Sequence, residues 1–219
     1  MLMETIIASF LLICLGLFFA VNLHNILVTH RTEDAVTPHA EIDRPSGITV
    51  SMATLGTLVY FIEAILHPLL VLANLVSLLS PFAFGLQPTF TPYARILGLL
   101  LTTFGYFLFL WSVITRGQYA TSWTMRDKHK LVTLGPYRYV RHPSYLAYFS
   151  MFIGLLAIWP SWLTLIPLIA IPGYFRVTFQ EEKLLEQRFG REYMKYQKKT
   201  GRFIPKLWQR IRNQESQSR

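Results

Sequence analysis

The sequence predicts an all-α integral membrane protein with about five transmembrane helices and a charged C-terminal helix on the cytoplasmic side. Hydrophobic residues make up 52% of the 219 residues and charged residues only 15%. Soluble domains carry roughly a quarter charged residues, so this chain has too few charges to cover a soluble surface. The apolar residues also form blocks long enough to cross a bilayer, and the basic residues lie almost entirely outside those blocks.

The net charge of +9 is compatible with nucleic-acid binding or with a membrane surface. The lipid-length blocks favour the membrane, where basic residues meet anionic headgroups and fix topology, so no nucleic-acid partner is expected. Cys14 is the only cysteine, which excludes an intrachain disulfide and a cysteine-based metal site; no metal is expected. We expect one membrane domain over residues 1–205 and a disordered tail over 206–219.

The first two spans are expected over Glu4–Leu23 and Ile48–Leu79, with a polar loop over His24–Gly47. The first block begins Met-Leu-Met-Glu and so lacks the positive start of a cleaved signal peptide, which favours a retained span. The second block is long for one span, and we expect a kink at Pro68.

The remaining spans are expected over Arg95–Ile114, Ser144–Trp159 and Trp162–Phe175, the last two joined in a tight hairpin. If the second block is one span, every lysine and arginine of the 21 except Arg95 falls on the same side. The positive-inside rule therefore favours five spans with a cytoplasmic C-terminus, in the inner membrane of a prokaryote or the endoplasmic reticulum of a eukaryote.

A charged helix is expected over Arg176–Thr200, with Gly190 able to break it in two. Helical spacing places one set of residues on a shared, partly apolar face and another set on the opposite, solvent-exposed face. The first set is Glu182, Leu185, Phe189, Tyr193 and Tyr196, and the second is Lys183, Glu186, Arg191 and Lys195.

The segment His129–Tyr148 concentrates histidine, arginine and tyrosine between two spans. Pro143 forces His142 into an extended conformation and suits the first turn of the following helix. Such a helix start has free N–H groups that can bind a carboxylate or phosphate. The segment is equally compatible with an interfacial belt of tyrosine and arginine at headgroup depth.

Two further acidic features stand out. Glu181 and Glu182 are adjacent carboxylates just below a span, where a nearby cation would relieve their repulsion; a solvated helix start is the alternative interpretation. Glu63 and His67 lie one helical turn apart inside an apolar block, and we interpret them as a structural hydrogen-bonded pair. His24, His30 and His39 have no metal-like spacing.

Two motifs resemble those of the isoprenylcysteine carboxyl methyltransferase family, part of a wider group of membrane methyltransferases that includes phospholipid N-methyltransferases. The first motif is HKLVTLGPYRYVRHPSY and the second is EEKLLEQRFGREYMKY followed by Phe-Ile-Pro. Together they span residues 129–205 and flank a two-span hairpin.

The resemblance implies a helical bundle that encloses S-adenosyl-L-methionine at the cytoplasmic membrane face. It implies that the cofactor is held by His129, Lys130, Leu131, Val132, Tyr137, His142, Pro143, Ser144, Tyr145 and Glu181. It leaves Glu182 and Arg176 as candidates for a catalytic role and Arg176 as a candidate substrate contact. The implied partners are the bilayer and a lipophilic or prenylated substrate.

The chain departs from the family pattern at two positions. Ala147 stands where the family often has glycine, and Val177 stands where a basic residue commonly contacts the acceptor. Arg176 is one residue earlier, which on a helix is a turn of about 100°. The departure at Val177 puts a prenylcysteine carboxylate acceptor in question.

The expected activity is methyl transfer to a lipophilic acceptor, with the C-terminal carboxylate of a prenylated cysteine as the first choice. Phospholipid N- or small-thiol S-methylation by the same fold is an alternative. Two other classes stay open: an NADPH-dependent sterol-type reductase, which carries a similar RHPxY motif, and a non-catalytic membrane protein.

Overall fold

The structure is a computed structural model that describes residues 2–33, 47–84, 91–117 and 130–206. For residues 28–33 it describes the backbone but not the side chains. His129, His39 and most of the C-terminal tail lie outside the described residues. The elements are helices in the order α1 (Leu2–Glu33), α2 (Ile48–Leu72), η1 (Val76–Phe82), α3 (Thr91–Arg116), η3 (Gly135–Arg138), α4 (Pro143–Ile158), α5 (Trp162–Leu165), η4 (Ile166–Ile169), α6 (Ala170–Phe189) and α7 (Arg191–Lys199).

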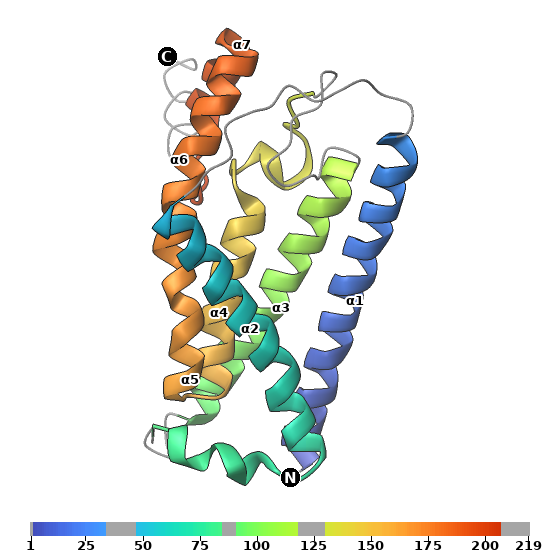
Figure 1. Ribbon diagram of the computed structural model, residues 1–219, viewed down its shortest axis with the longest axis vertical. Coiled ribbons are helices and arrows are strands. Elements are labelled where there is room, and N and C mark those ends of the chain that lie inside the picture. Colours follow the sequence, from blue (N-terminus) through green and yellow to red (C-terminus); the bar gives the residue numbers. More distant parts are fainter. Residues whose placement is uncertain (1, 34–46, 85–90, 118–129, 207–219) are drawn as a thin grey trace, which may run out of the picture.

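The apolar helices run alternately along the long axis of one bundle (Figure 1). In the described chain, four stretches are long and apolar enough to cross a membrane, Leu2–Leu27, Ile48–Leu72, Thr91–Arg116 and Trp162–Phe189, and α4 is a shorter apolar helix. The end of α1, the start of α2, the end of α3 and α7 share one end of the bundle, while η1 and α5 lie at the other (Figure 1). The predicted all-α membrane fold is confirmed.

The second predicted span is shorter than expected. α2 continues through Pro68 but ends at Leu72, and Asn74 then adopts a left-handed backbone with φ 59°. The apolar residues that follow form η1, which lies across the end of the bundle in Figure 1. The expected span to Leu79 is therefore wrong, because the hydropathy of residues 76–79 does not reveal the turn. The expected loop from His24 is also wrong at its start, since α1 continues to Glu33.

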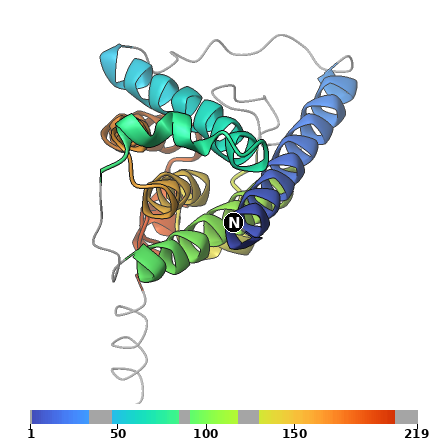
Figure 2. The same cartoon turned by 90° about the horizontal axis from the view of Figure 1, so that it is seen from below.

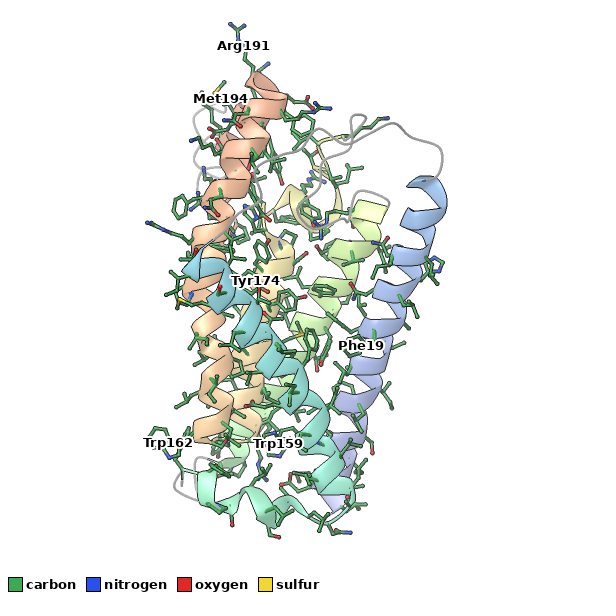
Figure 3. All side chains as sticks on the ribbon, in the orientation of Figure 1. Phe19, Trp159, Trp162, Tyr174, Arg191 and Met194 are labelled. Atoms are coloured by element: carbon green, nitrogen blue, oxygen red, sulfur yellow. The ribbon has the colours of Figure 1, made fainter. Side chains whose placement is uncertain are left out.

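The last span and the charged helix form one structure rather than two. The stretch Trp162–Phe189 runs without a gap from α5 into α6, so the expected boundary at Phe175 is absent. The chain then turns at Gly190, which has φ 49°. Arg191, labelled in Figure 3, lies at the extreme end of the molecule, and the chain after α7 returns to the level of Glu182.

This turn changes the expected face of the charged helix. The solvent-exposed set is confirmed, because its four residues, Lys183, Glu186, Arg191 and Lys195, are all exposed. The opposite set is split between two helices, with Glu182 and Tyr193 buried and Leu185, Phe189 and Tyr196 partly buried.

α3 and α4 pack backbone to backbone. A Cβ placed on Gly98 would lie 2.7 Å from the Gly154 carbonyl oxygen, and one on Gly105 would lie 2.8 Å from the Ala147 carbonyl oxygen. Small residues permit this close approach, which is a common way for membrane helices to associate. The contact fixes the first half of α4 beside the second half of α3, and Figure 2 shows the two helices next to each other.

The buried pair in α2 differs from the expected side-chain pair. His67 Nδ1 lies 3.3 Å from the backbone carbonyl oxygen of Glu63, not from its carboxylate. Oε2 of Glu63 is buried and has no hydrogen-bond partner among the described residues. The ring of His67 instead stacks on Trp159 at 5.3 Å, at the end of the bundle where Trp159 is labelled in Figure 3.

Candidate active site

The start of α4 forms one wall of the site. His142 has φ −124° and precedes Pro143, which occupies the first turn. Among the described residues no side chain caps this helix start, so the N–H groups of Ser144 and Tyr145 in the first turn have no intrahelical acceptor. These N–H groups and the positive end of the helix dipole suit a carboxylate or phosphate.

The loop before α4 is anchored to α3 and α7. Gly135 has φ 56°, and a Cβ there would lie 2.5 Å from Thr115 Oγ1. Tyr137 is buried, and its hydroxyl lies 2.8 Å from Ser112 Oγ, which in turn lies 2.6 Å from Ser144 Oγ. The Tyr196 hydroxyl donates to the Tyr137 carbonyl oxygen at 2.7 Å.

Glu181 extends from α6 toward the start of α4. The Tyr145 hydroxyl donates to its Oε1 at 2.6 Å, and His142 Nδ1 lies 3.3 Å from its Oε2. The Glu181 side chain is 25% exposed, so part of its carboxylate is open to a ligand. Residues about 40 positions apart in the chain thus meet in one place, and they offer a carboxylate beside a helix N-terminus.

Glu182 is surrounded by cations. Its Oε1 accepts from Arg141 Nε at 2.9 Å and from Arg202 Nε at 3.1 Å, and its Oε2 accepts from Arg202 Nη2 at 2.6 Å. His142 Nε2 lies 3.1 Å from Oε1. A buried carboxylate that is held by two guanidinium groups is a weak base, so this geometry gives Glu182 an anchoring role rather than the role of a proton acceptor.

His142 lies between the two carboxylates. Burial by itself would lower the pKa of His142, but its hydrogen bonds to Glu181 and Glu182 and their negative charges raise the pKa above its ordinary value. Since each ring nitrogen contacts a carboxylate oxygen, both act as donors when the ring is protonated. His142 therefore links the two glutamates, and its protonation adds a positive charge between them.

A stack of aromatic rings leads from His142 into the membrane core. His142 stacks on Tyr145 at 5.7 Å, Tyr145 on Tyr174 at 4.6 Å, and Tyr174 on Tyr148 at 5.6 Å. The Tyr174 hydroxyl lies 2.7 Å from Thr57 Oγ1 on α2. Tyr174, labelled in Figure 3, is between α6 and α4. The stack gives the site a wall of π faces, which attract cations.

The structure brings together six of the residues predicted to hold a cofactor: Tyr137, His142, Pro143, Ser144, Tyr145 and Glu181. Lys130, Leu131 and Val132 lie in the non-helical segment before η3, and Lys130 is exposed. Arg176 is exposed, whereas Val177 is fully buried on the inner face of α6. The candidate substrate contact thus points away from the face that carries Glu181.

Three residues of the site were not singled out from the sequence. Arg202 binds Glu182 from 20 positions away, and Ser112 bridges Tyr137 and Ser144. Arg116 ends α3, lies 6.0 Å from the Tyr137 ring centroid and has a buried Nε with no hydrogen-bond partner in the part of the chain that the structure describes. Only Arg202, adjacent to the Phe-Ile-Pro of the second motif, carried a local sequence signal.

Comparison with known proteins points to one class. Residues 93–192 match the phospholipid methyltransferase family. The chain is 30% identical over 143 residues to a protein-S-isoprenylcysteine O-methyltransferase of Xenopus laevis. The aligned region covers 60% of this chain and 50% of that protein. It is 33% identical over 122 residues to the Saccharomyces cerevisiae protein of the same name, covering 52% of this chain and 50% of that protein.

A protein with the same name from Tribolium castaneum is 32% identical over 120 residues, covering 50% of this chain and 41% of that protein. The chain therefore spans about half the length of the curated relatives it matches.

Proposed function

We propose that this chain belongs to the isoprenylcysteine carboxyl methyltransferase family, within the wider group of phospholipid and isoprenylcysteine membrane methyltransferases, and that it transfers a methyl group from S-adenosyl-L-methionine to a lipophilic acceptor. The observation that carries the proposal is the meeting of the two motifs: Tyr145 and His142 from the first contact Glu181 from the second.

The residues present fit this cofactor by their chemistry. S-adenosyl-L-methionine has a carboxylate, an ammonium group and a positively charged sulfur that supplies the methyl group. The uncapped start of α4 offers N–H donors for a carboxylate. The partly exposed carboxylate of Glu181 and the Tyr145 ring offer partners for positive charge.

The other described residues of the site orient Glu181, fix the loop before α4, neutralise Glu182 and exclude water. The Tyr145 hydroxyl orients Glu181, and Ser112 and Tyr137 fix the loop that precedes α4. Arg141 and Arg202 neutralise Glu182, so that one carboxylate of the adjacent pair stays available. The aromatic stack excludes water on the side of the membrane core, which favours a reaction between a cation and an anion.

For the acceptor, the names of the relatives favour the C-terminal carboxylate of a prenylated cysteine. A carboxylate is already ionised and needs no base. The burial of Val177 and the exposure of Arg176 remove a basic residue from the usual position, which keeps a phospholipid amine or a small thiol as the second choice. Such an acceptor would need a base to remove its proton. Glu182 is a poor base for this step because two arginines hold its carboxylate.

The orientation that we propose places the site and the C-terminus on the cytoplasmic side. Basic residues of the described chain support it: Arg116, Arg141 and Arg202 all lie at the end of the bundle that carries the site. Arg95, at the opposite end of α3, is paired with Glu4 at 2.5 Å. This distribution agrees with the positive-inside rule.

Calorimetric titration of the purified protein in detergent tests the class of enzyme. We expect binding of S-adenosylhomocysteine and none of NADPH. Binding of NADPH alone would favour the reductase, and binding of neither would contradict the enzyme proposal.

A radiolabelled methyl-transfer assay with a prenylcysteine, a phospholipid and a small thiol then identifies the acceptor, with transfer to the prenylcysteine as the expected result.

A further inference from the structure

The chain after α7 returns to the loop that precedes α4. Arg141 N donates to the Gly201 carbonyl oxygen at 2.9 Å, and His142 N donates to the Arg202 carbonyl oxygen at 3.1 Å. Val140 and Gly201 form an isolated parallel bridge. We call residues 200–203 the returning segment. It fixes the backbone on which His142 is presented to both glutamates.

The returning segment is closely packed at its centre. A Cβ on Gly201 would overlap the backbone carbonyl of Ile204, so only glycine fits there. Phe203 is buried against Phe149 at 5.2 Å and Phe175 at 4.7 Å, between ring centroids. The segment is therefore attached to both α4 and α6.

Arg202 is the side chain by which this segment reaches Glu182. Its guanidinium group donates to both carboxylate oxygens, at 3.1 and 2.6 Å, and lies 3.8 Å from the centroid of the Phe179 ring. A two-point contact of this kind combines charge with a fixed orientation. Phe179 lies on α6, as does Glu182, so Arg202 is held by two residues of that helix.

Arg141 cannot replace Arg202. Only its Nε reaches Glu182, at Oε1, because its Nη1 donates to the carbonyl oxygens of Thr200 at 2.5 Å and Gln197 at 3.3 Å. Oε2 of Glu182 is bonded by Arg202, and no other described side chain bonds that atom. Without Arg202, a buried carboxylate oxygen would lose its partner, and leaving a buried charge without its partner is costly.

We propose that Arg202 is a positioning residue for the cofactor site: it neutralises Glu182, so that His142 bridges both glutamates and Glu181 keeps its orientation toward Tyr145. The inference rests on the proposed function, since it concerns how that site holds the cofactor. Loss of Arg202 leaves Glu182 undercompensated and draws the His142 ring to it. His142 then leaves Glu181, and the open carboxylate loses one of its two anchors.

The test compares five variants with the wild-type protein by calorimetric titration with S-adenosylhomocysteine. Arg202→Gln should weaken binding by roughly tenfold to a hundredfold, as does the loss of partners that orient a binding group elsewhere. Arg202→Lys keeps the charge but not the two-point contact and should weaken binding less. Arg191→Gln, at an exposed arginine of α7, is the matched control and should bind as the wild type does.

The decisive variants remove the charge that Arg202 neutralises. Glu182→Gln combined with Arg202→Gln should bind more tightly than Arg202→Gln alone, because the uncompensated carboxylate is gone; Glu182→Gln alone completes the double-mutant cycle. A role confined to stability would lower the melting temperature of Arg202→Gln and leave the affinity of its folded fraction unchanged. Melting curves in the same detergent report the folded fraction of each variant.

Two results would overturn the inference alone: wild-type affinity in folded Arg202→Gln, or a double variant that binds no better than Arg202→Gln. If Arg202→Gln does not fold, Arg202→Lys decides instead, and wild-type affinity in folded Arg202→Lys would refute the inference. A wild-type protein that binds no S-adenosylhomocysteine overturns the proposed function as well.

Discussion

Replacing Glu181 by glutamine removes one negative charge from the site and keeps the shape of the side chain. In the structure this carboxylate accepts the Tyr145 hydroxyl at 2.6 Å and lies 3.3 Å from His142 Nδ1. Glutamine retains an oxygen for the Tyr145 hydroxyl, so the local structure should persist. The variant therefore tests the charge of Glu181 rather than the fold around it.

The expected loss of affinity follows from the partial exposure of the side chain. Two unit charges about 4 Å apart interact by about 4 kcal/mol at an effective dielectric constant of about 20. The Glu181 side chain is 25% exposed, so solvent screens part of this attraction. We retain roughly half, about 2 kcal/mol, which corresponds to a rise of about 30-fold in the dissociation constant.

The assay is calorimetric titration of wild-type protein, Glu181→Gln and Glu186→Gln with S-adenosylmethionine and with S-adenosylhomocysteine. Glu186 is exposed on the same helix and serves as the control for a change of net charge. If Glu181 faces the sulfonium, the loss should be larger for S-adenosylmethionine; if it faces the ammonium group, both ligands should lose equally. Unchanged affinity of folded Glu181→Gln for both ligands would refute the reasoning.

Three further predictions concern the same region and its support. Tyr145→Phe removes the donor to Glu181 and should weaken cofactor binding by roughly tenfold, as for hydrogen bonds to charged groups, with an unchanged melting temperature because the ring stays stacked. The raised pKa of His142 means that its protonated form stabilises the fold below about pH 6.5, and that this stabilisation is lost as the pH rises through the raised value. The melting-temperature difference between wild type and His142→Gln should therefore shrink from about pH 6 to about pH 9, and a constant difference would contradict it. Gly154→Val should destabilise the α3–α4 contact by about 1–3 kcal/mol, measured by thermal unfolding in detergent, and a wild-type melting curve would show that the backbones separate freely.

The spans could be predicted because transfer into lipid depends on each segment's own composition. The ends of the spans could not always be predicted, because composition does not show where the chain turns. Residues 76–79 are as apolar as the preceding helix, yet Asn74 turns the chain before them. At the other end, α6 continues past Phe175 since nothing in a helix obliges it to stop at the membrane surface.

The candidate site was predictable where the motifs are local and not where a partner comes from far along the chain. His142, Tyr145 and Glu181 could be named because their motifs give residue types at fixed spacing. The pairing of Glu182 with Arg202 depends on the turn at Gly190 and on how far α7 returns, which no local pattern specifies. The same limit applies to Glu63, whose carboxylate was expected to meet His67 and does not.

The returning segment also has a consequence for biosynthesis. Because the chain is made from its N-terminus, α4 and α6 can be inserted well before residues 200–203 have left the ribosome. Until then His142 lacks its backbone contacts to this segment, and Glu182 lacks Arg202. Assembly of the site is thus one of the last steps in making residues 1–206. A ribosome stalled before residue 200 would leave an inserted bundle in which His142 and Glu182 lack their contacts to the returning segment.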